Sequence, residues 1–466
     1  MTSPLAARLL KSRLMLAAFA AAFGAVVGHM LLRPGEPTQV QRPGLATAAA
    51  PPGVDTSAAP AASPAADRLA ALPATPAASP AQAASALLQA PPLAAIVPLP
   101  FELAVLKAAD SLLANAQIDV ARLTSANRIP LVIDPLVDGI AGTQTVATRT
   151  IGERLAALII NRYPRYEVRR FSSENLAQMP LVLLGTLTGV NAVGNPAGER
   201  ESYRVWLTLV DLRANKVVGK ARTYAQVVGV NANPTATFRD SPAWTKDPAT
   251  LAYIEACQKS HLGDPINPAY IERIHTAAAI ADAIDAYDAG EYLQSLGKYT
   301  QILQAPEGNQ LRVHTGIYLN HWKLKNRAQA QSAFAKIVEF GLSHRLLAMK
   351  FEFRPGSAAF GDQTTGVPTQ YAMWLRTIAS KVATSSACME LTGHSSPTGP
   401  EPLNERLSFK RAEFVQARLI KESLALDNRT LANGVGSRQT MIGTARDDDT
   451  DALDRRVEMK LFECSR

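Results

Sequence analysis

Three short stretches decide the fold expected for residues 346–466: GHSSPTG (393–399), NERLSFKRA (404–412) and DRRVE (454–458). The first combines Gly, Ser and Pro and predicts a loop after an apolar strand. The second opens a long helix with apolar positions at helical spacing. We therefore expect elements that alternate between helix and strand, which predicts a mixed sheet with its helices on one face. In chain order, these elements are a strand and turn at 349–357, a helix at 371–382, a strand at 388–393, a helix at 404–424 and a strand at 455–463.

The three stretches resemble the pattern GHTDxxG, NxxLSxxRA, [ND]RRVE of the OmpA-like family. The resemblance implies an α/β sandwich that binds the peptide stem of peptidoglycan. Carried over position by position, it implies a binding site made of Gly393, His394, Ser396, Asn404, Leu407, Arg411 and Arg456. His394 is expected to hold its loop rather than to take part in chemistry.

One position departs from the family pattern, because Ser396 stands where the family has an aspartate. The diaminopimelate of the stem peptide carries a carboxylate and an ammonium on one carbon. An arginine such as Arg411 can pair with the carboxylate through two parallel N–H groups, whereas a serine offers the ammonium a hydroxyl and no charge. Glu401, in the same loop, is a candidate substitute for that charge. The alternative is a domain that has lost this ligand and serves only for docking.

The cysteines point to an oxidising compartment. Cys388 begins one predicted strand and Cys464 follows the end of another, a placement that suits a disulfide. Cys257, the third cysteine, has no partner in metal-ligand spacing. We expect no metal site, since the acidic run at 447–451 is better explained as solvated loop charge.

The N-terminal segment, residues 1–33, contains an apolar run of nineteen residues at 14–32 that follows Arg8, Lys11 and Arg13. This length matches a membrane-spanning helix, and the preceding cations predict a cytoplasmic N-terminus. A signal peptide cleaved after Gly28 is the alternative. Small residues recur every four positions at Ala20, Gly24 and Gly28, so a homodimer within the membrane is possible.

Residues 34–96 have the composition of a disordered linker. Fourteen of the 31 prolines lie between positions 34 and 100, interleaved with alanine, serine and threonine. Such a segment buries too little apolar surface to offset its ordering entropy. We interpret it as a tether between the membrane and the folded part of the chain.

Residues 97–265 are predicted to form an α/β domain. The stretch 181–228 alternates apolar and polar residues around the turn Arg213-Ala-Asn-Lys216, which predicts a hairpin. The predicted elements are helices at 101–116 and 148–162 and strands at 128–134, 166–171, 181–190, 203–212 and 217–228. Their order resembles the FlgO and CsgG-type domains of surface-appendage assembly proteins, a fold shared by activators of cell-wall synthases.

Residues 268–345 are predicted to form two helical hairpins. Positions such as Ala283, Tyr287, Gly290 and Tyr299 resemble a degenerate tetratricopeptide repeat, and a second copy is suggested around Trp322 and Phe334. Repeats of this kind need neighbours to cover their apolar faces. A generic helical connector is the alternative to a peptide-binding groove.

Composition and motifs also exclude several classes of function. The net charge of +8 is spread along 466 residues without a basic, aromatic-rich stripe, which argues against nucleic acid as a partner. The sequence contains no nucleophile elbow, phosphate-binding loop or HExxH motif. We therefore expect neither an enzyme nor a cofactor.

Together these features predict a multidomain cell-envelope protein. It would be held in the bacterial inner membrane through residues 14–32, face the periplasm and contact peptidoglycan and other envelope proteins. With signal cleavage it would instead be periplasmic or associated with the outer membrane. The leading function is a non-catalytic scaffold or anchor, and the alternative is a module that activates a cell-wall synthase or an appendage-assembly machine.

Overall fold

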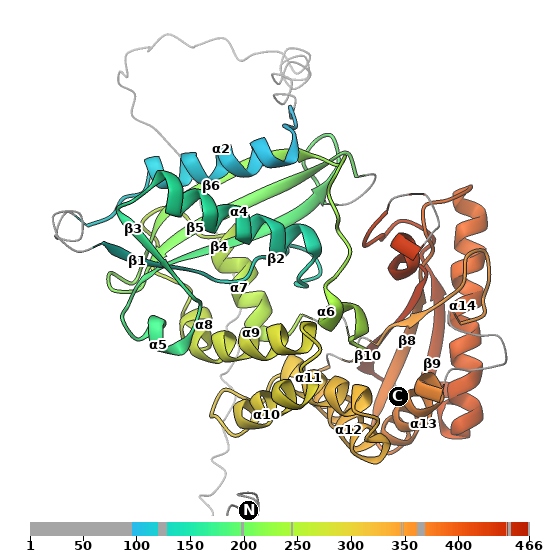
Figure 1. The fold of residues 1–466 in the computed structure, drawn as a ribbon. Coiled ribbons are helices and arrows are strands. Elements are labelled where there is room, and N and C mark those ends of the chain that lie inside the picture. Colours follow the sequence, from blue (N-terminus) through green and yellow to red (C-terminus); the bar gives the residue numbers. More distant parts are fainter. Residues whose placement is uncertain are drawn as a thin grey trace, which may run out of the picture. The chain divides into compact units, whose positions relative to one another are not determined.

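The computed structural model describes residues 96–119, 128–196, 200–243, 246–345, 347, 349–360, 369–443, 445 and 449–464 (Figure 1). The predicted membrane segment, its small-residue repeat and residues 34–95 of the predicted linker lie outside these ranges. Among the described residues, no helix combines the length and apolar character that crossing a membrane requires.

The first sheet has six strands in the order β3-β1-β4-β5-β6, with β2 paired to β4. β1 pairs in parallel with both β3 and β4, whereas β4, β5 and β6 form an antiparallel meander. The strands are β1 (Ile129–Ile133), β2 (Val137–Asp138), β3 (Tyr166–Arg169), β4 (Leu181–Val190), β5 (Ser202–Asp211) and β6 (Lys216–Gln226). The predicted strands and the predicted hairpin are confirmed, with shifts of one or two residues at most ends.

Helices cover both faces of this sheet (Figure 1). Leu183 faces the core formed with α2 (Phe101–Ala114) and α4 (Val146–Arg162), and the next residue, Leu184, faces the opposite core. That second core contains α7 (Pro248–Gln258), α8 (Pro268–Ile271) and the start of α9 (Ile274–Asp288). Two short helices, α5 (Ser173–Leu176) and α6 (Ala236–Asp240), lie in connecting segments.

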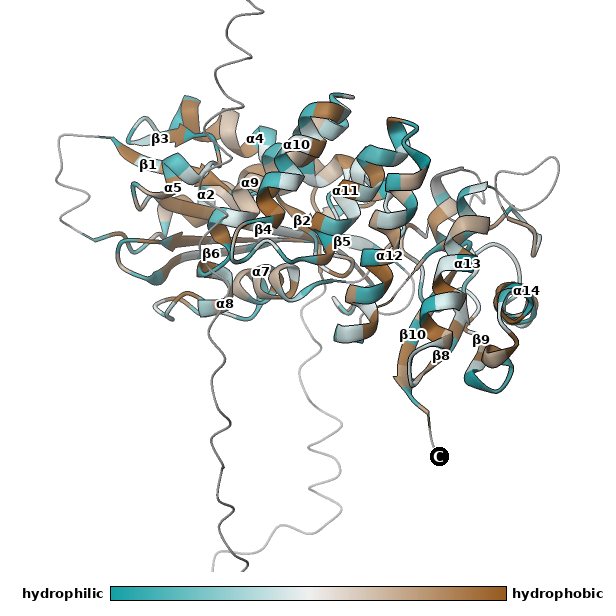
Figure 2. Cartoon of the chain, turned by 90° about the horizontal axis from the view of Figure 1, so that it is seen from below, coloured by the Kyte–Doolittle hydropathy of each residue, from teal (hydrophilic) through white to brown (hydrophobic). Residues whose placement is uncertain are grey.

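Helices α9 to α12 form the two predicted hairpins. They are α9, α10 (Tyr292–Leu303), α11 (Leu311–Lys323) and α12 (Arg327–His344). Gly290 makes the first turn with a positive φ of 80°, a conformation that glycine adopts without a steric penalty. The hydroxyl of Ser295 in α10 donates to the carbonyl of Ala283 in α9 and accepts from the side chain of Asn320 in α11, so it links three helices. Teal and brown alternate along these helices in Figure 2, as expected for helices with one apolar face.

The second sheet has four strands in the order β7-β10-β8-β9. Its strands are β7 (Phe351–Glu352), β8 (Ala387–Gly393), β9 (Thr430–Gly434) and β10 (Arg456–Glu463). Its helices are α13 (Thr369–Ala383), α14 (Glu401–Glu422) and two 3₁₀ turns, η1 (Leu424–Arg429) and η2 (Asp449–Asp454). The β8–β9 pair is parallel and the others are antiparallel, so the sheet is mixed as predicted. Two details differ from the prediction: the first strand is only two residues long, and β9 was not anticipated.

A disulfide joins Cys388 to Cys464, as predicted from the strand ends. β8 and β10 are antiparallel neighbours, and Phe462 pairs with Cys388 in the ladder. The bridge therefore links Cys464, the last described residue, to the start of β8 in the same sheet.

Replacing both cysteines, Cys388→Ser with Cys464→Ser, should destabilise this sheet. The two residues are 76 positions apart, and on the chain-entropy model closing a loop of that length contributes about 4 kcal/mol. Urea unfolding followed by far-UV circular dichroism measures the loss. The Cys257→Ser variant is the control, since Cys257 is a buried free thiol. Equal stability of the double variant and the wild type would contradict the prediction.

One buried carboxyl group links α8 to the first sheet. Asp134 directly follows β1 and accepts a hydrogen bond on Oδ2 from the hydroxyl of Tyr270 at 2.7 Å. Burial raises the pKa of Asp134 to about 7, although the Tyr270 bond and the nearby Arg312 oppose the shift. The folded chain therefore keeps this proton at pH values where an unfolded chain, with an aspartate pKa of about 3.9, has lost it.

This proton predicts a pH dependence of stability. Between about pH 4 and pH 7 the folded state binds more protons at Asp134 than the unfolded state, so stability should fall as pH rises through this window. The difference amounts to a few kcal/mol, on the order of 4 at most. The Asp134→Asn variant lacks this slope, and chemical unfolding of both proteins at pH 4.5 and pH 8 measures it. Parallel stability curves for the two proteins would show that Asp134 does not hold the proton.

Candidate functional site

The predicted binding residues meet where β8 ends and α14 begins. Gly393 is the last residue of β8, and a Cβ at this position would overlap the carbonyl oxygen of Ser408 in α14. Gly434 at the end of β9 is equally close, with an added Cβ 2.6 Å from the backbone nitrogen of Phe409. Two glycines thus let the first half of α14 lie directly against the sheet.

Arg411 is the centre of this region and is fully buried. Its Nε donates to the carbonyl of Ser357 at 2.9 Å, Nη1 to that of His394 at 2.8 Å and Nη2 to that of Arg354 at 3.0 Å. Its guanidinium also lies over the ring of Phe353 at 5.5 Å. Arg411 therefore ties the turn after β7 and the loop after β8 to α14.

The loop that follows β8 is buried as well. The side chain of His394 is 1% exposed, and neither ring nitrogen has a hydrogen-bond partner among the described residues. Burial, together with the charge of Arg456, lowers the pKa of His394 to about 3, so the ring is neutral at physiological pH. Ser396 is also buried.

The other predicted residues surround this loop at different depths. The Asn404 side chain donates to the carbonyl of Gly399 at 3.3 Å, whereas Leu407 is only half-buried. Arg456 is buried and donates to Glu458 at 2.6 Å. Burial alone would raise the pKa of Glu458, but the charge of Arg456 and this bond hold it below its usual value.

Two carboxylates fix the neighbouring loops. Asp454 accepts hydrogen bonds from the backbone N–H groups of Met441, Ile442 and Gly443, and its burial raises its pKa despite these bonds. Glu401 accepts from the backbone and hydroxyl of Ser437. Glu401 therefore links the start of α14 to the segment that follows β9.

Sequence reasoning predicted a turn at the end of the stretch 349–357 but missed the role of Arg354 and Ser357, whose carbonyls accept from Arg411. These residues contribute main-chain carbonyls, which every residue carries, so the sequence holds no signal for their role.

The prediction for the acidic run at 447–451 was only partly right. Asp451 is fully buried, contrary to the prediction of solvated charge, while 447 and 448 lie outside the described residues. Within the described ranges no group of three or more His, Cys, Asp or Glu could hold a metal ion.

Comparison with known proteins gives similarity to solved structures only. The peptidoglycan-associated lipoprotein of Burkholderia pseudomallei is 22% identical over 24% of this chain and 89% of that chain, with a TM-score of 0.21. A periplasmic domain of Helicobacter pylori MotB is 15% identical over 25% of this chain and 76% of its own, with a TM-score of 0.21. The OmpA-like domain of FopA1 from Francisella tularensis is 19% identical over 25% and 75%, with a TM-score of 0.20. No protein-family model matches the chain, and no curated protein matches it.

Adding a methyl group at Gly393 should disrupt the contact between α14 and the sheet. In the Gly393→Ala variant the new Cβ meets the backbone of Ser408, which cannot rotate away, so we expect a loss of about 2–3 kcal/mol. The matched control is Gly297→Ala within α10, where nothing lies within 4 Å of the added Cβ. That variant should gain about 0.5–1 kcal/mol from helix propensity. Equal effects of the two substitutions on urea unfolding would contradict this account.

Proposed function

We propose that this chain is a non-catalytic cell-envelope scaffold whose C-terminal OmpA-like domain associates with peptidoglycan. The observation that carries the proposal is the meeting of the three sequence stretches at His394, whose carbonyl accepts from Arg411 and whose backbone N–H donates to the carbonyl of Arg456. The disulfide supports an exported location, because such bonds persist in oxidising compartments. The apolar run at 14–32 would hold the protein in the inner membrane, and residues 34–96 would let the folded part reach the wall and other envelope proteins.

In this proposal Arg411 has two roles. Its N–H groups hold the turn at Arg354 and Ser357 together with the carbonyl of His394, and its positive charge draws the carboxylate of a stem peptide toward the same loops. Ser396, in place of the family's aspartate, offers the ligand ammonium a hydroxyl. We therefore expect weaker binding to the wall than an aspartate would give, since a neutral hydrogen bond contributes less than a charge-assisted one.

Co-sedimentation of the full chain with purified sacculi tests the proposal. Ser396→Asp should raise the affinity by about tenfold, the effect of one added charge-assisted bond. Thr398→Asp is the matched control, because it adds the same charge at an exposed position of the same loop. Thermal unfolding of each variant checks that the buried substitution at Ser396 leaves the domain folded.

The outcomes separate the candidate functions. Binding by the wild type that strengthens only with Ser396→Asp supports recognition of the stem peptide. Equal gains from both aspartates would indicate attraction to the polymer in general. Sedimentation that requires a second envelope protein would favour the regulatory alternative, and its absence in the wild type and in folded Ser396→Asp would exclude wall binding by this domain.

A further inference from the structure

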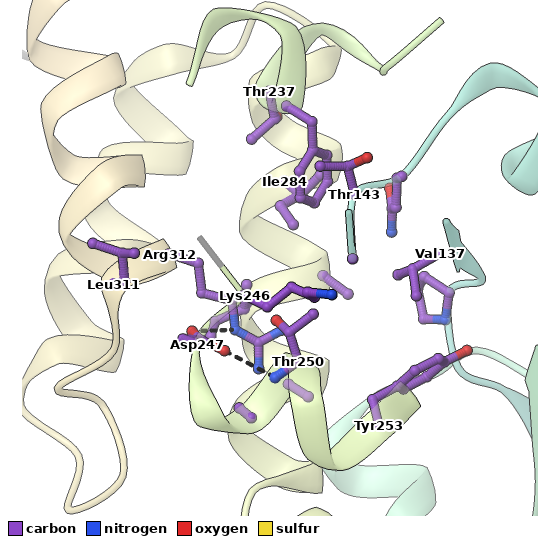
Figure 3. A pocket seen from close by; sticks show the side chains of 18 of the residues that line it. Val137, Thr143, Thr237, Lys246, Asp247, Thr250, Tyr253, Ile284, Leu311 and Arg312 are labelled. Carbon is purple, nitrogen blue, oxygen red and sulfur yellow. Dashed lines mark hydrogen bonds and ion pairs between the residues drawn. The ribbon is translucent and has the colours of Figure 1, made fainter. Parts of the chain in front are cut away.

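A second site lies far along the chain from the OmpA-like stretches, at the carboxyl end of β1. It is a cavity of about 110 Å³ that is partly open to solvent and is lined by the end of β1, the N-terminus of α7 and helices α8, α9 and α11 (Figure 3). β1 lies between β3 and β4 in the sheet and pairs in parallel with both. The chain passes from β1 to β3 on one side of β1 and then to β4 on its other side, so the direction of the strand order reverses at β1. In open α/β sheets, ligands bind outside the carboxyl ends of strands at such a reversal of strand order.

The size of the cavity limits what it can hold. An apolar protein cavity of roughly 150 Å³ accommodates benzene, which has six carbon atoms. By the same proportion, a cavity of about 110 Å³ has room for about four or five non-hydrogen atoms, and because it is open to solvent on one side, one or two further ligand atoms can lie in its mouth. Peptides, nucleotides and sugars are all larger than this.

One carboxylate oxygen in the cavity wall lacks a hydrogen bond. The Asp247 side chain is 3% exposed, and its Oδ1 caps α7 by accepting from the backbone of Thr250 at 2.8 Å. Its Oδ2 is buried and has no hydrogen-bond partner among the described residues. The nearest cation, Arg312, lies 3.7 Å away through Nε, which donates to Gln310 instead. A buried carboxylate oxygen without a donor is costly, which indicates that a ligand donor completes the site.

Cations, hydroxyl groups, apolar groups and a second carboxyl group, Asp134, form the rest of the wall. Figure 3 shows Lys246, Asp247 and Arg312 gathered on one side of the cavity, with Val137 on the other. Within the described residues Lys246 has no carboxylate in ion-pair range, so the cations on this side outnumber the carboxylate. Ile284 and neighbouring alanines of α7 and α9 add an apolar surface. The cavity thus offers an acceptor for a cation, donors for an anion and space for a small apolar group.

We propose that this cavity binds a small zwitterionic α-amino acid, of the size of glycine or alanine. The ligand ammonium donates to Oδ2 of Asp247, and the ligand carboxylate accepts from Arg312 and Lys246. A simple carboxylate would leave Oδ2 without a donor, and a simple amine would supply no acceptor to Lys246 or to the Nη groups of Arg312. The proposal concerns a different part of the chain from the wall-binding site and does not depend on it.

Isothermal titration calorimetry of the full chain with alanine, propionate and ethylamine tests the proposal. Propionate is alanine without its ammonium group, and ethylamine is alanine without its carboxylate. Alanine should bind at least about tenfold more tightly than either, because each analogue loses a charge-assisted contact. Equal affinities for the three probes, or no binding of alanine at about 10 mM, a concentration that detects affinities weaker than millimolar, would overturn the proposal.

Two variants assign the contacts. Asp247→Asn keeps the cap of α7, since asparagine is an equally good N-cap, and should weaken alanine binding about tenfold or more. Arg312→Gln should weaken alanine and propionate together while leaving ethylamine unchanged. Glu255→Gln, a half-buried residue of α7 outside the cavity, is the matched control and should have no effect. Alanine affinity unaffected by either cavity variant would refute the assignment, and Arg312→Gln decides the matter alone if Asp247→Asn fails to fold.

Discussion

The arrangement of the α/β part depends on the burial of β4 on both faces. All ten residues of this strand are buried, and a strand covered on both sides is stable only when its neighbours supply every backbone hydrogen bond. β1 and β5 supply those bonds, while α2 and α4 cover one face and α7 to α9 the other. Covering the second face brings the N-terminus of α7 to the carboxyl end of β1, where the cavity forms.

The C-terminal part depends on a different interaction, the solvation of a buried guanidinium by main-chain carbonyls. Removing Arg411 from water is costly unless its donors are satisfied. Three carbonyls that accept from its Nε, Nη1 and Nη2 come from two loops that are distant in sequence. Moving either loop would leave donors of the buried Arg411 unsatisfied, so both loops are kept in place. The shape of the candidate binding site follows from this arrangement.

The sequence predicted the regular elements where apolar patterning was continuous. β4 was predicted at its observed limits because the stretch from Leu181 to Val190 is mostly apolar and alternates with threonine in its second half. β9, with the sequence TLANG, was missed because alternate residues are exposed and Asn-Gly favours a turn. It forms a strand because it pairs with β8 and packs under α14. β9 therefore forms because of tertiary contacts, and a local sequence pattern does not contain that information.

The candidate sites differ in how far the sequence could predict them. The motif residues near Arg411 were predicted together because their spacing is a family pattern, but the burial of Arg411 and its carbonyl partners was not. Asp134, Asp247 and Arg312 were not associated at all. They lie on elements far apart in the chain, and each alone has an ordinary local explanation such as a helix cap. Only the packing of α7, α8 and α11 around the end of β1 brings them to one cavity.

The electrostatics of the motif region favour recognition over chemistry. A general acid or base needs a pKa near the working pH and access to its substrate. His394, the conspicuous candidate in the motif, is buried and has its pKa lowered to about 3. Asp454 and Glu401 are engaged by backbone N–H groups that fix the adjoining loops. The charged groups of this region therefore hold its own loops in place, as the scaffold role proposed above requires.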